Sequence, residues 1–408
     1  MNQVVKLSLV ESKHSRNLGI VLILLGVVSG VIFGNESGTA GFQLTESWIV
    51  NIPVQRFSQI LSVVLVGTGA LQLYRGLGKA LNVILILGMI LFVVNFLAWS
   101  VNGESFNFTG MMQDTVARSV PIVLGAIAGL ICERSGVINI AIEGQLLFAA
   151  FTGSIVGSIL NPWMGIVGAV LAGAALGGLL AVLAIRFQVD QVIVGFAINF
   201  LALGVTSFVG QRILVERPEF NSLRPFMSFA VPLFSDIPVL GEVLFNQNLF
   251  VYFTYLIVIV TTWSLFKTRW GLRTRAIGEY PKAAGSLGVD VLRLRYLNVI
   301  IGGAVAGLGG AWWPVGAVGR FDENITGGRG FIALAAVIFG RWHPVGVLGA
   351  ALVFTFAEAA RLKLSNFETM IPSEFLLSAP YIVTLVVVAG FVGRSRSPKS
   401  VGLPYTEQ

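Results

Sequence analysis

Twelve mainly apolar runs divide this chain of 408 residues, and most of them are long enough to cross a lipid bilayer. A bilayer core about 30 Å thick requires about 20 such residues per helical crossing. The runs occupy residues 18–34, 58–74, 81–99, 115–132, 144–160, 163–184, 191–210, 249–266, 296–316, 329–340, 344–360 and 376–393. Because lipid offers the backbone no hydrogen-bond partner, segments of this kind fold as α-helices. The sequence therefore predicts an all-α, polytopic integral membrane protein with about 10–12 transmembrane helices, broken or re-entrant segments included.

The composition excludes several classes of protein. Hydrophobic residues make up 55% of the chain and charged residues 12%, with a mean hydropathy of +0.83. A soluble domain carries about 25% charged residues, so a soluble enzyme, a nucleic-acid-binding protein and a disordered chain are excluded. With Cys132 as the one cysteine, no internal disulfide can form, and two histidines do not suggest a metal centre. We therefore expect no catalytic residue, metal site or cofactor.

Lys and Arg outnumber Asp and Glu by 27 to 20, a net charge of +7, and the basic residues gather in particular connections. Three precede the first run, which lacks a cleavage pattern and is predicted to be an uncleaved helix. Seven lie in one connection: Lys267, Arg269, Arg273, Arg275, Lys282, Arg293 and Arg295. Short cytoplasmic loops are enriched in Lys and Arg. With twelve crossings the basic segments share one side, so we expect a plasma-membrane protein with both termini in the cytoplasm and the long loop 211–248 outside.

The segment Cys132–Gly144 places charged and amide side chains between two apolar runs. As a short cytoplasmic turn, it would leave Glu133 and Arg134 solvated. As a helix break or re-entrant turn, it would line a pathway, since irregular backbone at membrane depth survives only against protein or water. If the segment is helical, Asn139 and Glu143 lie on one face and could present an amide and a carboxylate to a polar cavity.

The connection 267–294 is long for a turn and is not of low complexity. Within it Pro281 suits the first turn of a helix and Gly288 suits its end. One interpretation is a basic loop that anchors at anionic lipid headgroups. The other is a short Ala- and Gly-rich helix at the membrane face, which suits docking into a groove on another protein.

A third polar segment, Phe321–Phe331, carries several glycines just ahead of the run at 329–340. The free N–H groups of the helix start could face a polar ligand, or the segment could simply begin a helix with Arg329 at the interface. The break that follows, 340–344, is either a cytoplasmic turn or the tip of a re-entrant element. The G-x-x-x-x-G-K-[ST] spacing of a phosphate-binding loop occurs nowhere in the sequence.

Isolated polar and aromatic residues have similar alternatives. Asn199 could bond between helices or contact a ligand, and Glu358 could reach the membrane interface. Trp312 and Trp313 suit an aromatic belt at the outer interface.

These segments, in this order and spacing, resemble the permease family of ABC importers for ribose-type sugars, branched-chain amino acids and nucleosides, and above all its nucleoside branch. The motifs that carry the resemblance are Glu133–Gly144, Asp190–Asn199, Ala276–Gly288, Gly302–Leu308, Gly328–Ala336 and Gly340–Pro344. The resemblance covers about residues 110–393 and does not explain residues 1–105. Where Tyr280 stands, the family usually has Asn.

The resemblance implies a transport subunit that holds no ATP, so that hydrolysis takes place in a partner ABC ATPase subunit. It also implies a second permease subunit, identical or paralogous, and an extracytoplasmic solute-binding protein. The family's coupling helix would map onto residues that meet the ATPase: Gly278, Glu279, Tyr280, Pro281, Lys282, Ala283, Ala284 and Gly288. The candidate translocation pathway comprises Asn139, Glu143, Asn199, Gly328 and Gly330.

The sequence thus predicts the permease subunit of an ATP-driven importer for nucleosides or a related ribose-bearing solute. The alternatives are a permease for simple sugars or branched-chain amino acids, and an ion-coupled secondary transporter. The scarcity of Asp, Glu and His within the membrane argues against a proton relay. The predicted organisation is an N-terminal extension with about three transmembrane helices (1–105), a permease domain (106–393) and a cytoplasmic tail (394–408).

Overall fold

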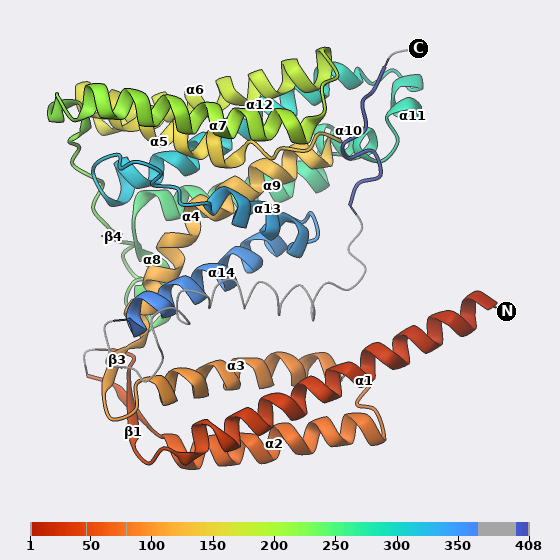
Figure 1. The fold of residues 1–408 in the computed structure, drawn as a ribbon, viewed down its shortest axis with the longest axis vertical. Helices are drawn as coiled ribbons and strands as arrows, with labels where there is room; N and C mark the ends of the chain where they lie inside the picture. The colour runs from red at the N-terminus through yellow and green to blue at the C-terminus, as the bar shows by residue number, and fades with distance from the viewer. Residues whose placement is uncertain (1, 46, 79, 366–396, 407–408) are drawn as a thin grey trace. The chain divides into compact units, whose positions relative to one another are not determined.

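The structure, a computed structural model, describes residues 2–45, 47–78, 80–365 and 397–406 (Figure 1). The chain forms two compact units. Among the described residues, the first comprises those up to Met112 together with 360–365, and the second comprises Gln113–Ala359 together with 397–406. The predicted crossing at 376–393 lies outside the described residues.

Ten of the described helices are long and apolar enough to cross a membrane. They are α1 (Asn2–Val31), α2 (Val54–Tyr74), α3 (Ala80–Ser100), α4 (Phe108–Arg134), α5 (Ile142–Ile159), α6 (Pro162–Ala181), α7 (Gln191–Val209), α9 (Leu249–Lys267), α12 (Val291–Ala311) and α14 (Pro344–Leu364). Three continue into a π-helical turn: α6 into η2 (Val182–Arg186), α7 into η3 (Gly210–Leu214) and α12 into η5 (Trp312–Ala317). The prediction of an all-α, polytopic membrane protein is confirmed.

The predicted run at 329–340 forms a shorter helix, α13 (Arg329–Phe339), of 11 residues. At 1.5 Å per residue it is about 16 Å long, roughly half the thickness of the hydrocarbon core. The chain then turns into α14 through Arg341 and Trp342, which have left-handed backbone conformations (φ +55° and +51°). α13 is therefore too short to cross the membrane by itself. Of the two interpretations of this region, it fits the re-entrant element.

The first unit is a bundle of α1, α2 and α3 with a small sheet at one end (Figure 1). Leucines from all three helices form its core: Leu22, Leu61, Leu65, Leu81 and Leu85. Three buried polar side chains bond one another across the bundle, because Ser58 Oγ donates to Asn95 Oδ1 and Asn95 Nδ2 donates to Ser29 Oγ, both at 2.7 Å. In the sheet, β1 (Thr39–Gln43) pairs antiparallel with β2 (Ile49–Pro53) and parallel with β3 (Ser105–Asn107).

Helices α5, α6 and α12 of the second unit pack closely against one another, and glycines bring α6 and α12 together. A Cβ atom at Gly173 on α6 would lie 2.3 Å from the carbonyl oxygen of Gly303 on α12. One at Gly307 would lie 2.4 Å from the carbonyl oxygen of Ala169. Small residues permit this approach, which takes the place of hydrophobic driving force between helices in lipid. α4 is the most buried of the ten spanning helices.

The long segment between α7 and α9 has little regular structure. It contains η4 (Pro218–Asn221), α8 (Leu240–Phe245) and a short antiparallel pair of strands, β4 (Phe229–Ala230) and β5 (Asn246–Gln247).

Two interruptions of the helical pattern position the candidate site. Between α4 and α5 the backbone is irregular over residues 135–141, here called the helix break, and Gly136 has a φ of +92°. Between α9 and α12 lie two short helices, α10 (Arg269–Glu279) and α11 (Pro281–Ser286). Figure 1 shows α10 and α11 beside the C-terminal residues, at one end of the helices of the second unit.

Candidate functional site: the helix break and the coupling segment

Side chains of α7 satisfy the irregular backbone of the helix break. Gln191 Oε1 accepts a hydrogen bond from the N–H of Ile138 at 2.7 Å. Asn199 bonds twice: its Nδ2 donates to the carbonyl oxygen of Ile140 (3.0 Å) and its Oδ1 accepts from the N–H of Gly144 (2.8 Å). Irregular backbone inside a membrane protein needs such partners. Asn199, which could bond between helices or contact a ligand, therefore bonds α7 to the start of α5.

The charged residues ahead of the helix break are bonded within the protein and are not simply solvated. Glu133 is buried, and its Oε2 accepts a hydrogen bond from Trp342 Nε1 at 2.5 Å. Arg134 donates to the carbonyl oxygen of the same Trp342 from Nε (3.0 Å) and Nη2 (2.6 Å). The interpretation of this segment as a solvated turn is wrong, because the turn after α13 covers it.

Asn139 and Glu143 do not share a helical face, because Asn139 lies in the helix break and α5 begins only at Ile142. Asn139 is fully buried, and its Nδ2 donates to Gln145 Oε1 at 3.0 Å. Asn139 Oδ1 and Gln145 Nε2 are buried and have no hydrogen-bond partner among the described residues. This amide pair thus holds one free acceptor and one free donor next to the helix break.

Glu143 binds the start of α13 with both carboxylate oxygens. Its Oε1 accepts from Thr326 Oγ1 (2.6 Å) and from the N–H of Gly328 (2.8 Å), and its Oε2 accepts from the N–H of Gly330 (2.6 Å). A carboxylate is favoured at the partly positive N-terminus of a helix. The structure therefore brings together three of the candidate pathway residues, Glu143, Gly328 and Gly330. In this structure the N–H groups of Gly328 and Gly330 donate to the carboxylate of Glu143.

The side chain of Arg329 forms an ion pair with Glu358 of α14. Its guanidinium also lies 5.9 Å from the centre of the Trp313 ring. Trp313 and Trp312 are buried, so the prediction that they form an aromatic belt at the outer interface is wrong. Glu358 holds α14 to α13 instead of merely reaching the interface.

The coupling segment, defined as residues 278–288, has the predicted helix. Pro281 occupies the first turn of α11, and Gly288 follows its end with a φ of +81°. Tyr280 and Leu287 are 65% and 85% exposed. Further residues that present their side chains or backbone to the outside are Glu279, Lys282, Ala283, Ser286 and Gly288. The exposed face is thus mixed, with two large apolar side chains.

Two residues of the predicted docking set face the chain itself. A Cβ atom at Gly278 would lie 2.2 Å from the carbonyl oxygen of Arg134, so glycine is required where α10 meets the end of α4. Ala284 is buried in a cluster with Ile277 and Val291. The prediction that Gly278 and Ala284 meet a partner is therefore corrected: they position the segment, and their neighbours present its surface.

Segments predicted to be cytoplasmic from their basic residues converge at this end of the second unit. The ring of His343, in the turn after α13, stacks on Phe266 of α9 with centroids 4.8 Å apart. The guanidinium of Arg275 lies 5.1 Å from the centre of the same Phe266 ring. Together with the hydrogen bonds of Arg134, these two ring contacts join four parts of the chain: the ends of α4 and α9, the helix α10, and the α13–α14 turn.

Three residues that hold the site were not predicted from the sequence: Gln191, Thr326 and Trp342. The first two are polar residues that border apolar runs, and each lies in a segment that the sequence pattern singled out: Asp190–Asn199 and Phe321–Phe331. Trp342 belongs to the motif Gly340–Pro344, but its hydrogen bond to Glu133 could not be predicted, because the two residues are 209 positions apart in the chain.

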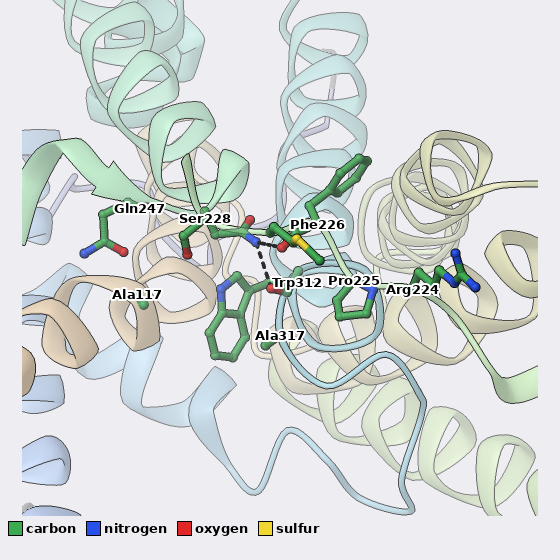
Figure 2. Close-up of a pocket in the computed structure, with 11 residues that line it drawn as sticks. Ala117, Arg224, Pro225, Phe226, Ser228, Gln247, Trp312 and Ala317 are labelled. Carbon is green, nitrogen blue, oxygen red and sulfur yellow. Dashed lines mark hydrogen bonds between the residues drawn. The ribbon is translucent and has the colours of Figure 1, made fainter. Parts of the chain in front are cut away.

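A cavity of about 430 Å³ opens elsewhere in the second unit, between segment 224–228, β5 and η5 (Figure 2). Its wall combines the ring of Trp312 with polar side chains of Arg224 and Gln247. Asn248 holds this wall together, since its Nδ2 donates to the carbonyl oxygens of Phe226 (2.5 Å) and Gly316 (2.9 Å). None of the predicted pathway residues lines the cavity.

Comparison with known proteins gives the family. Residues 111–391 match the family of permease components of branched-chain amino acid transport systems. The chain belongs to this family. It is therefore a membrane transport component, and the family resemblance predicted from its motifs is confirmed. Residues 1–110 lie outside the matched range.

Individual relatives are similar over most of their length. The guanosine ABC transporter permease protein NupQ of Bacillus subtilis is 39% identical over 304 residues, which cover 71% of this chain and 94% of NupQ. The nucleoside ABC transporter permease protein NupC of Lactococcus lactis is 34% identical over 314 residues, 73% of this chain and 98% of NupC. The glucose ABC transporter permease protein TsgB13 of Haloferax volcanii is 28% identical over 259 residues, 60% of this chain and 67% of TsgB13. No solved protein structure matches the chain.

Proposed function

We propose that this chain is the permease subunit of an ABC importer that takes up nucleosides. The observation that carries the proposal is its similarity to two nucleoside permeases, at 39% and 34% identity over nearly their whole length. The glucose permease TsgB13 is less similar, at 28% identity. The free energy for uptake comes from a partner ATPase, because the sequence has no phosphate-binding loop of its own.

The ATPase binds the exposed face of the coupling segment. Tyr280 and Leu287 supply apolar side chains that project from a basic surface, and Lys282 and Ala283 lie between them. Rigid packing under this face supports transmission of a movement, since Gly278 and Ala284 anchor the segment to α4 and α12. A second permease subunit and an extracytoplasmic solute-binding protein complete the transporter.

The solute passes the helix break and the start of α13. Asn139, Glu143, Asn199, Gly328 and Gly330 are the proposed pathway residues. The free acceptor of Asn139 and the free donor of Gln145 would complement a polar solute at this place. Glu143 and the Arg329–Glu358 pair hold α13 in one arrangement, and a transport cycle would exchange these contacts for others.

Uptake of radiolabelled guanosine into proteoliposomes tests the proposal. The complete transporter is purified with its partner subunits and reconstituted. Guanosine should accumulate only when ATP is present on the side of the membrane that carries the ATPase. Unlabelled adenosine should compete, and ribose, glucose and leucine should not. Competition by glucose or leucine alone would reassign the substrate. Uptake driven by a Na⁺ or H⁺ gradient without ATP would replace the importer with a secondary transporter.

A further inference from the structure

The C-terminal residues 398–405, here called the C-terminal strap, bond to the end of α10. The N–H of Ser400 donates to the carbonyl oxygen of Gly278 at 2.9 Å. Ser400 Oγ lies 2.6 Å from the same oxygen and 3.0 Å from that of Ile277. The last carbonyl groups of a helix lack partners within the helix. Ser400, which is buried, supplies them from a distant part of the chain.

Tyr405 packs against α11. Its ring joins the cluster of Ile277, Ala284 and Val291. A Cβ atom at Gly285 would lie 2.8 Å from Tyr405 Oη, so Gly285 provides the space for the tyrosine. The strap therefore contacts both short helices of the coupling region.

The strap also contacts the helix break. The N–H of Gly402 donates to the carbonyl oxygen of Gly136 at 3.2 Å. Arg295 of α12 lies between the two, because its Nε donates to the carbonyl oxygen of Ser135 and its Nη1 to that of Leu403, both at 3.1 Å. Its guanidinium is also 6.0 Å from the centre of the Tyr405 ring.

Arg295 makes the strap and the helix break dependent on each other. It is 2% exposed, and its hydrogen bonds among the described residues go to backbone carbonyl groups. Its Nη2 is also buried and has no hydrogen-bond partner among the residues that the structure describes. A buried charge is costly unless polar groups surround it. Loss of the strap would remove one of the few groups that solvate this cation.

We propose that the C-terminal strap is a positioning element that ties the coupling segment to the helix break. This inference rests on the proposed function, in which a partner ATPase moves the coupling segment. Ser400 and Tyr405 transmit that movement from α10 and α11, and Arg295 passes it to the carbonyl groups where α4 ends. The contact of Gly278 with Arg134 is a second link, which holds α10 when the strap is absent.

The test compares the complete reconstituted transporter with variants of the strap. Tyr405→Ala and a chain that ends at residue 397 should insert, assemble and hydrolyse ATP at the basal rate. Stimulation of ATPase by loaded binding protein and the maximal uptake rate should fall about tenfold, within the range of coupling between distant sites. The KM for solute should not change. Tyr405→Phe keeps the ring and should behave like the wild type. Normal stimulated uptake by the truncated chain would overturn the inference.

A distance measurement tests the strap independently of transport. Spin labels on Ser286→Cys and Leu403→Cys, both exposed positions, report the separation of α11 and the strap. Cys132 is buried, which limits background labelling. The distance distribution should be narrow and equal with and without ATP, and Tyr405→Ala should broaden it. Labels that move independently in the wild type would reject the strap. A wild-type transporter without ATP-driven uptake would instead reject the proposed function.

Discussion

Glu143 is a buried carboxylate whose three hydrogen-bond donors all lie at the start of α13. Glu143→Gln would replace one acceptor oxygen with a donor and leave an N–H of α13 without a partner. Such an unsatisfied group costs about 1–3 kcal/mol. We expect a lower unfolding temperature in detergent and a loss of most uptake. Unchanged melting and uptake would show that the carboxylate does not hold α13.

Gly330 tests the same contact from the other side. A Cβ atom there would lie 2.5 Å from the backbone N and Cα of Glu143, so Gly330→Ala should separate α13 from α5. Gly349 on α14 is the matched control, because a Cβ atom there meets nothing within 4 Å. Ala is favoured over Gly inside a helix by about 1 kcal/mol. Thermal unfolding should therefore show Gly330→Ala destabilised and Gly349→Ala equal to or more stable than the wild type.

Sequence patterns identified these residues but not their partners. Glu143 and Asn199 were detectable as polar groups next to apolar runs, which is costly in lipid and so indicates a role. The hydrogen bonds of these side chains depend on where the backbone leaves the helical conformation. Because Asn139 lies in the helix break and Glu143 lies in α5, the two side chains bond to different neighbours. Burial was equally hidden, because Trp312, Trp313 and Ala284 have the same local sequence whether they face lipid, a partner or the protein.

The exposed face of α11 and its flanks can be tested as a docking surface. Ala283→Asp combined with Leu287→Asp places two charges on that face and leaves the buried Ala284 intact. ATP-driven uptake should fall to background, because desolvated, unpaired charges oppose binding of the ATPase. Insertion and expression should be normal, since both side chains are exposed. Co-purification measures binding of the ATPase, and transport into vesicles measures ATP-driven uptake.

Leu240→Asp provides the control for that pair. Leu240 is 59% exposed and belongs to the segment 211–248, which is proposed to face the exterior. It should leave ATPase binding unchanged. Equal loss of ATPase binding in both variants would mean that an added charge, not its place on α11, is responsible. Helix α11 itself was predictable, since Pro281 and Gly288 mark its ends. Whether the run at 329–340 crosses the membrane was not, because the break at 340–344 suits a cytoplasmic turn as well as the tip of a re-entrant element.

The range of the family match predicts a separable transport domain. The relatives NupQ and NupC are covered almost completely by matches that span 71% and 73% of this chain, and the family match begins at residue 111. We propose that residues 106–393 transport and that 1–105 are an extension. Deleting 1–105 removes three crossings, so a cleavable signal peptide must restore the orientation of α4. The shortened chain should assemble and take up guanosine. Normal insertion without uptake would assign residues 1–105 a part in transport.

Orientation can be decided with two exposed serines. Seven spanning helices, α2–α7 and α9, separate Ser37 from Ser286, so an odd number of crossings puts them on opposite sides. The basic residues around α10 and α11 predict that Ser286 lies in the cytoplasm. An impermeant maleimide should label Ser37→Cys in intact cells and Ser286→Cys only after permeabilisation, with little signal from the buried Cys132. The reverse pattern would put the coupling segment outside, where no ATPase could reach it, and would remove the physical basis of ATP-driven import.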